Sequence, residues 1–175
     1  LSLLVDKELV SVEHFRVAAK ARAFEAAEPS AVWAANWLFV DPMGFLDELE
    51  AQKARNPEGA ANLLVAVATE LEDARSNRLQ EHVRRNPSIA PALGRLYGEL
   101  CLAIPPSEDT PRLPGKIYTV TERERAQRTR DRLPELLAST HSIAGYRTLK
   151  ALLENTTSEP AHVRQYFLAL MRSTA

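Results

Sequence analysis

The chain has 175 residues, of which 45% are hydrophobic and 26% are charged, a composition typical of a globular rather than a disordered protein. Its 22 basic and 23 acidic side chains give a net charge of −1, so no overall field would recruit nucleic acid or an anionic membrane. The single cysteine, Cys101, excludes an internal disulfide and favours a reducing, cytoplasmic location. The apolar stretches are too short to cross a bilayer. The length fits one helical domain over residues 1–175.

Three Asx-Pro pairs divide the first half of the chain: Asp41-Pro42, Asn56-Pro57 and Asn86-Pro87. An Asx side chain at an N-cap accepts a hydrogen bond from a free backbone N–H of the first helical turn. Proline suits the next position, because it has no N–H and its φ is already helical. Each pair therefore predicts the start of a helix, and Asn86→Ala is expected to cost about 0.5–2 kcal/mol through loss of the cap.

Apolar spacing predicts helices throughout this half of the chain. The expected helices cover residues 11–27 and 31–40, a segment beginning at Pro42, a segment from Pro57 past Glu72, and a segment after Pro87. Trp33 and Trp37 share one face of the second helix, which predicts core packing rather than an exposed binding platform. Gly94 and Gly98 share a face of the last helix, where they would let a neighbouring helix approach closely.

Residues 105–115 contain four prolines and a glycine, which excludes a helix or a central strand. They predict a long loop, or a subdomain boundary at 105–116. After it, Thr121 and Glu124 form a capping-box pattern for a helix through Arg132, and Pro134 is expected to kink that helix or to start a new one. Apolar stripes over residues 143–153 and 163–171 complete a total of seven to nine helices.

The sequence predicts no catalytic, cofactor-binding or metal-binding residues. Gly115-Lys116 lacks the first glycine and the hydroxyl residue of a P-loop. The four histidines, at 14, 82, 141 and 162, show none of the local pairing that metal sites require. Cys101 lies on the apolar stripe of its helix, which is typical of a buried hydrophobic residue rather than a nucleophile.

The strongest local charge feature is residues 121–132, where five arginines outnumber three acids. Arg125, Arg128 and Arg132 share one helix face. One interpretation is a plain solvated surface. The other is contact with an acidic protein partner or with another part of a longer parent chain, because arginine is enriched at interfaces.

Two parts of the chain resemble a known family. Residues 31–49 read as helix, Asp-Pro, helix, and the later segment begins Leu-Pro-Glu-Leu-Leu-Ala at Leu133 and continues through Ser142, Tyr146-Arg-Thr-Leu149, Leu152, Pro160 and Arg164. They resemble the HEAT-like α-helical repeats in the non-catalytic regions of bacterial NACHT/STAND-type signalling NTPases. The resemblance implies stacked antiparallel helical hairpins with a recognition or scaffolding role, in a fragment of a larger bacterial protein whose nucleotide chemistry lies elsewhere.

We therefore expect an all-α protein that acts as a non-catalytic interaction or sensor module. Its partner would be a protein or another part of the parent chain, with no cofactor, nucleic acid or membrane involved. The alternative is a small helical-bundle hydrolase or transferase that uses dispersed His and Glu side chains. An enzyme should show a pocket with convergent polar groups and displaced pKa values, whereas a binding module should show a groove or patch without them.

Overall fold

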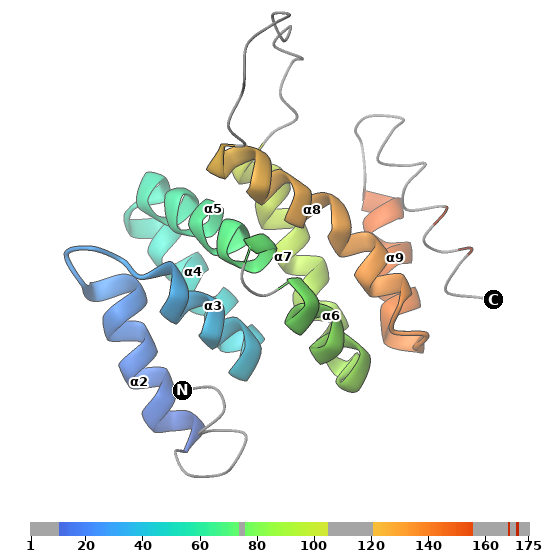
Figure 1. Ribbon diagram of the computed structural model, residues 1–175, viewed down its shortest axis with the longest axis horizontal. Helices are drawn as coiled ribbons and strands as arrows, with labels where there is room; N and C mark the ends of the chain where they lie inside the picture. Colours follow the sequence, from blue (N-terminus) through green and yellow to red (C-terminus); the bar gives the residue numbers. More distant parts are fainter. Residues whose placement is uncertain (1–10, 74–75, 105–120, 156–167, 169–170, 172–175) are drawn as a thin grey trace, which may run out of the picture.

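The computed structural model describes residues 11–73, 76–104 and 121–155, together with Leu168 and Met171. This part of the chain contains eight α-helices and no strand, which confirms the all-α class (Figure 1). The helices are α2 (Val12–Lys20), α3 (Ala31–Val40), α4 (Pro42–Arg55), α5 (Pro57–Asp73), α6 (Ser76–Arg85), α7 (Ala90–Ala103), α8 (Glu122–Ala138) and α9 (Ile143–Asn155). None of these helices combines the length and the apolar character that a membrane span requires.

Three sequence predictions lie wholly or mostly outside the described residues: the loop at 105–116, His162 and the helix over 163–171. Within the described residues, the helix that was expected to run past Glu72 ends at Asp73, and α6 follows as a separate helix. A π-helical turn, η1 (Ala21–Glu25), extends α2, and a 3₁₀ turn, η2 (Pro87–Ile89), precedes α7.

Two of the three Asx-Pro pairs start helices as predicted. The Asp41 Oδ1 atom accepts a hydrogen bond from Gly44 N–H at 3.2 Å, and Pro42 is the first residue of α4. Asn56 Oδ1 likewise accepts from Gly59 N–H at 2.9 Å, and Pro57 begins α5. Asx side chains therefore satisfy the free N–H groups at both starts, as capping requires.

At the third pair the prediction of a side-chain cap is wrong. Pro87 begins the 3₁₀ turn η2, and the Asn86 side chain makes no capping hydrogen bond. Backbone carbonyls take its place: Ile89 N–H donates to Asn86 C=O at 3.1 Å, and Ala90 N–H donates to Pro87 C=O. The turn itself thus satisfies the N–H groups of Ile89 and Ala90.

The start of α8 confirms the predicted capping box. Thr121 Oγ1 accepts from Glu124 N–H at 3.2 Å, and Glu124 Oε2 accepts from Thr121 N–H at 2.7 Å. Of the two alternatives predicted for Pro134, the start of a new helix is wrong, because α8 continues through it to Ala138. Pro134 is buried, and packing of this face holds the helix together although proline removes one hydrogen bond from it.

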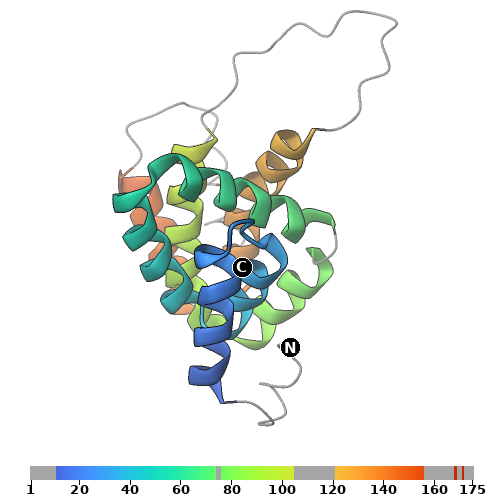
Figure 2. The same cartoon turned by 90° about the vertical axis from the view of Figure 1, so that its left-hand side faces the viewer.

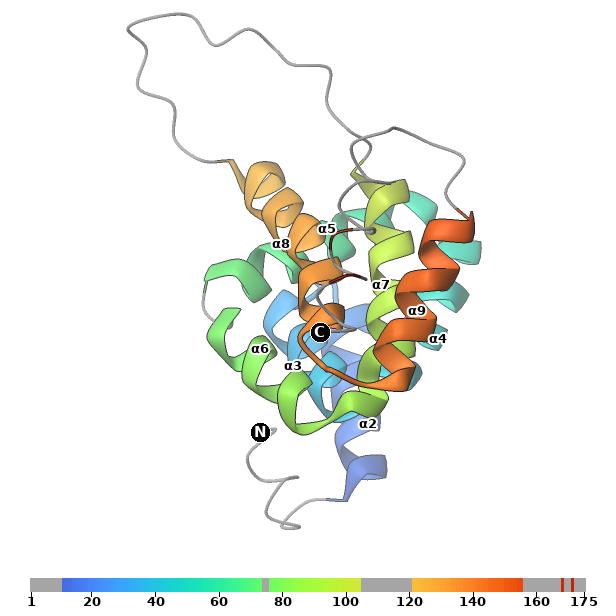
Figure 3. The ribbon, with the colours of Figure 1, turned by 90° about the vertical axis from the view of Figure 1, so that its right-hand side faces the viewer.

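The helices follow one another across the molecule from α2 at one end to α9 at the other (Figure 1). Figure 2 shows α2 in front at the N-terminal end, and Figure 3 shows α7, α8 and α9 grouped at the opposite end. The central helix is α5, which contacts α3, α4, α6, α7 and α8, with its largest contact to α8. Its buried leucines, valine and alanines form the middle of one continuous core, namely Ala60, Leu63, Leu64, Val67, Ala68 and Leu71.

Both tryptophans pack in the core, as predicted. Trp37 is 3% exposed and contacts the rings of Phe24 and Phe45, at centroid distances of 5.9 and 6.3 Å. Trp33 stacks on Phe15 at 6.1 Å. These aromatic contacts join α2, η1, α3 and α4, so the N-terminal end is held by large side chains in offset or edge-on geometry.

The prediction for the glycine pair on α7 is right at one position and wrong at the other. A Cβ atom on Gly94 would lie 2.3 Å from Thr148 Cγ2, so this glycine does let α9 approach α7 closely. Among the described residues, no atom outside its own helix lies within 4 Å of a Cβ atom placed on Gly98. A shared helix face does not guarantee a shared neighbour, because Thr148 of α9 lies against Gly94 and not against Gly98.

Candidate functional site

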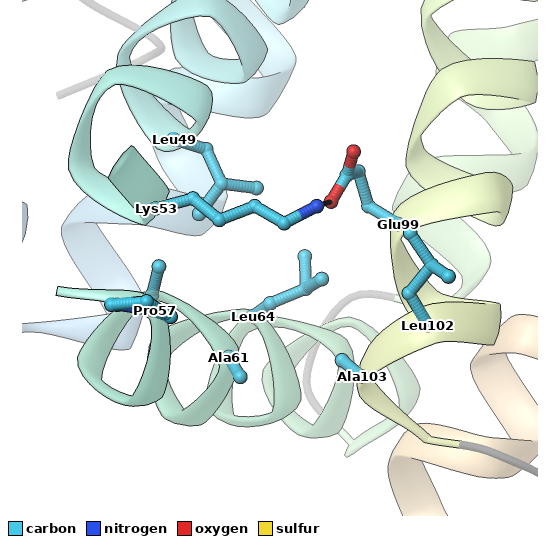
Figure 4. A pocket seen from close by; sticks show the side chains of 9 residues that line it. Leu49, Lys53, Pro57, Ala61, Leu64, Glu99, Leu102 and Ala103 are labelled. Carbon is cyan, nitrogen blue, oxygen red and sulfur yellow. Dashed lines mark hydrogen bonds and ion pairs between the residues drawn. The ribbon is translucent and has the colours of Figure 1, made fainter. Parts of the chain in front are cut away.

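A hollow lies between α4 and α7, with α5 as its floor (Figure 4). We call it the α4–α7 groove. Its volume is about 100 Å³, and it is lined by Leu49 and Lys53 from α4, Pro57, Ala60, Ala61 and Leu64 from α5, and Glu99, Leu102 and Ala103 from α7. All but two of these residues are apolar, so the groove offers a water-exposed apolar surface set between three helices.

The local sequence explains why this space stays open. One residue, Asn56, separates the end of α4 from the start of α5, so the two helices diverge directly from a capped turn. Between Pro57 and Leu64, α5 contributes only the small side chains of Ala60 and Ala61 to the lining of the gap. Small side chains cannot fill the distance between α4 and α7, because helix axes cannot approach closer than their larger residues allow.

Ion pairs bridge the rim of the groove. Lys53 Nζ lies 2.9 Å from Glu99 Oε2, and Figure 4 shows this pair spanning the gap from α4 to α7. Further along α7, Arg95 binds both Asp47 and Glu50 of α4 at 2.5 Å. The Lys53 and Glu99 side chains are 43% and 22% exposed, and ion pairs in such positions add little stability. The ion pairs therefore join α4 to α7 at the rim, and the rim remains accessible to solvent.

Leu102 stands at the edge of the groove with 71% of its surface exposed. A single exposed leucine is ordinary in globular proteins. This one, however, directly adjoins an apolar pocket, so the exposed apolar area extends from the side chain into the groove. Such a combination is typical of a surface that takes another apolar side chain.

The groove lacks the chemistry of an active site. Its two charged residues, Lys53 and Glu99, neutralise each other, and its volume is well below the roughly 300–1,000 Å³ of small-molecule sites. Displaced pKa values occur elsewhere. Burial raises the pKa of Asp41, but hydrogen bonds from Arg16, Gly44 N–H and Trp37 outweigh it and leave the pKa below its ordinary value. That carboxylate is occupied as the cap of α4.

The other reactive side chains lie apart from one another. His14 contacts Ser11 Oγ through Nδ1 at 2.7 Å, His82 meets the Phe39 ring edge-on at 5.4 Å, and His141 occupies the turn after α8 with φ of 45°. Burial raises the pKa of the half-buried Cys101 thiol from its ordinary value, which favours the protonated form near neutral pH. Within the described ranges, no three His, Cys, Asp or Glu side chains are grouped to hold a metal ion.

The three predicted partner-binding arginines have different environments. Arg128 is exposed, whereas Arg125 and Arg132 are half-buried. Arg132 Nη1 lies 3.2 Å from Glu72 Oε2 of α5. The face is therefore partly engaged within the protein, and Arg128 is its most accessible member.

Sequence reasoning missed the role of Arg130, which it counted as one more arginine of a charged helix. The side chain is 2% exposed, and its Nη1 donates to the Ile104 carbonyl at the end of α7 at 2.5 Å. Its Nε donates to Asp131 at 2.8 Å. The available signal was spacing, because Arg130 falls on the same apolar stripe as Ala126, Leu133 and Leu137.

Comparison with known proteins gives no relative from which a role could be carried over: no family model matches the chain, and no curated protein and no solved structure is significantly similar to it.

Proposed function

We propose that the protein is a non-catalytic helical interaction module that holds an apolar side chain of a protein partner in the α4–α7 groove. The observation that carries this proposal is the character of the groove: it is apolar, open, the size of one side chain, and rimmed by a mutually neutralised ion pair. Protein interfaces concentrate their binding energy in a few anchor residues that fill such pockets.

The HEAT-like arrangement implied by the resemblance is part of this proposal. Consecutive helices contact one another at α3–α4, α4–α5 and α8–α9, and single-residue connections join α3 to α4 and α4 to α5. Stacked helical hairpins present extended surfaces for partners. A fragment of a larger signalling protein would use such a surface for recognition, with any nucleotide chemistry elsewhere in the parent chain.

The groove distinguishes this proposal from the enzyme alternative. A helical hydrolase or transferase would need His and Glu side chains brought together around a substrate-sized pocket. In the part of the chain that the structure describes, the histidines occupy three separate places, and the groove contributes only Lys53 and Glu99. The geometry therefore favours binding over catalysis.

Arg128 supplies a second contact in this proposal, to acidic residues of the partner. It is the exposed member of the predicted face formed by Arg125, Arg128 and Arg132. An exposed charge mainly affects the association rate and its salt dependence. Arg128→Ala should leave stability unchanged and weaken partner binding at low salt more than at high salt.

A selection from a random peptide library displayed on phage tests the proposed function. The bait is the whole chain, and enriched peptides are then measured by fluorescence anisotropy against Ala61→Leu, in which a larger side chain fills the groove. The matched control is Ala51→Leu, which makes the same change at an exposed position of α4 that does not line the groove.

We expect enriched peptides to share one large apolar residue, to lose at least about tenfold in affinity for Ala61→Leu, as removal of an anchor implies, and to bind Ala51→Leu as they bind the parent. Failure to enrich any peptide, or equal binding to both variants, would contradict the proposal.

A further inference from the structure

We propose that a second copy of this chain occupies the α4–α7 groove, with Leu102 of each copy seated in the groove of the other. The inference rests on the proposed function, for which it names the partner. It follows from the position of one exposed side chain relative to one pocket and from the charges between them.

Leu102 and the groove form a projection and a hollow side by side. Leu102 is 71% exposed and also lines the edge of the pocket, and Figure 4 places it on α7 across from Leu49 and Pro57. A two-fold axis that passes between a projection and an adjacent hollow lays each projection over the hollow of the other copy. A surface of this kind is complementary to itself.

Size supports the same occupant. The groove has a volume of about 100 Å³, which suits one aliphatic side chain rather than a ligand of drug size. Its floor and walls are alanine, leucine and proline side chains, so an incoming leucine would exchange water for apolar contact on every side except the rim.

The charges on the rim are compatible with the same two-fold arrangement. Lys53 and Glu99 face each other across the groove and both retain exposed surface. The two-fold operation that places Leu102 in the opposite groove also brings Lys53 of one copy toward Glu99 of the other. A rim of one sign would repel its own copy, whereas this pair can exchange partners between copies.

The contact centres on one leucine from each copy, so it falls at the small end of specific interfaces and should be weak, with a dissociation constant on the order of micromolar to hundreds of micromolar. Sedimentation equilibrium over a concentration series measures it. The parent chain is expected to show a monomer–dimer equilibrium, and Leu102→Glu to weaken it at least about tenfold, as loss of a central anchor does.

Ile143→Glu is the matched control for this variant. Ile143 is as exposed as Leu102, at 72%, but lies on α9 and does not line the groove. It should associate like the parent chain. Circular dichroism confirms that both variants fold, which is expected because neither side chain is buried.

A charge exchange separates contacts between copies from contacts within one copy. Lys53→Glu and Glu99→Lys each place like charges across the rim, and each alone should associate more weakly than the parent. An equimolar mixture of the two restores opposite charges only across a two-fold interface, at both Lys53–Glu99 positions. The mixture should therefore form a heterodimer that neither variant forms with itself.

The inference is overturned if the parent chain stays monomeric up to about 0.5 mM, above the range expected for a weak interface. It is overturned equally if Leu102→Glu associates like Ile143→Glu, or if the mixed charge variants do not associate. A monomeric chain whose groove still binds selected peptides keeps the proposed function and assigns the groove to a foreign segment. A chain that neither dimerises nor binds peptides contradicts both.

Discussion

The two sides of α5 are built differently. Toward α8 the packing leaves a hollow of only about 10 Å³, and polar side chains of this contact bond to backbone carbonyls: Thr129 Oγ1 donates to Ala68 at 2.7 Å, and Thr69 Oγ1 donates to Glu122 at 2.9 Å. Toward α4 and α7 the helices leave an open apolar groove, with exposed ion pairs at its rim. The arginine-rich helix α8 thus supplies buried structure, while the first two turns of α5, with Pro57, Ala60, Ala61 and Leu64, supply part of the accessible apolar surface.

The largest effect should come from the buried contact between α8 and the end of α7. Arg130→Met removes the guanidinium that bonds the Ile104 carbonyl and leaves a buried acceptor without its partner, at a cost of about 3 kcal/mol. Arg95→Met, the matched change at the rim, should cost less than about 1 kcal/mol, because its ion pairs are partly solvated. Urea unfolding measures both. Equal losses of stability would show that the buried arginine and the rim arginine contribute alike, contrary to the account.

The second comparison lies within α7. Gly94→Ala forces a Cβ against Thr148 Cγ2 and should destabilise the protein by about 1–2 kcal/mol through overpacking. Gly98→Ala meets open space and should stabilise it by roughly 0.5–1 kcal/mol, because the unfolded chain loses freedom. Thr148→Ser removes the clashing methyl group, so the double variant with Gly94→Ala should recover most of the loss. If thermal unfolding ranks the two glycine variants the other way, the assigned neighbours are wrong.

The third comparison concerns the helix starts. Asn56→Ala removes a hydrogen bond to Gly59 N–H and should cost about 1 kcal/mol. Asn86→Ala removes no capping bond and should cost less than about 0.5 kcal/mol, as for an ordinary surface change. Chemical denaturation of the two single variants under the same conditions checks this order, and a larger loss at Asn86 would contradict it.

The smallest effect concerns acid. Because hydrogen bonds hold the folded pKa of Asp41 below its ordinary value of 3.8, its carboxylate adds stability that is present above that value. The stability is lost as the pH falls through the folded pKa. Asp41→Asn keeps an acceptor for Gly44 N–H but has no charge to lose, so its stability should fall less between pH 5 and pH 2. If the urea midpoints of the two proteins fall in parallel as the pH is lowered, the proposed contribution of the Asp41 charge is excluded.

Much of the fold follows from local sequence signals. The caps at Asp41 and Asn56 and the capping box at Thr121 and Glu124 are satisfied by neighbouring atoms, so reading them requires no knowledge of the tertiary structure. Asn86 shows the limit of such signals, because a 3₁₀ turn competes with the side chain for the same N–H groups. Pro134 shows another limit, since burial of its helix face outweighs the lost backbone bond.

The candidate site could not be predicted in the same way. Leu49 belongs to a predicted apolar stripe, whereas Ala61 and Leu102 lie outside the stripes of their helices, and only the crossing of three helices brings them together. The predicted charge feature was real in the sequence, but its spacing did not show that Arg132 would bond Glu72 or that Arg130 would be buried. Groove geometry depends on how far α4 and α7 diverge, and no local pattern encodes that distance.

Methyl NMR tests the central claim most directly. The leucine methyl groups of the chain are observed while a peptide enriched in the library selection is added. The account predicts that signals of Leu49, Leu64 and Leu102 in the groove shift together, while those of Leu71 and Leu136 between α5 and α8 stay in place. Shifts at Leu71 and Leu136 without shifts in the groove would contradict it, because the accessible binding surface would then lie on the other side of α5.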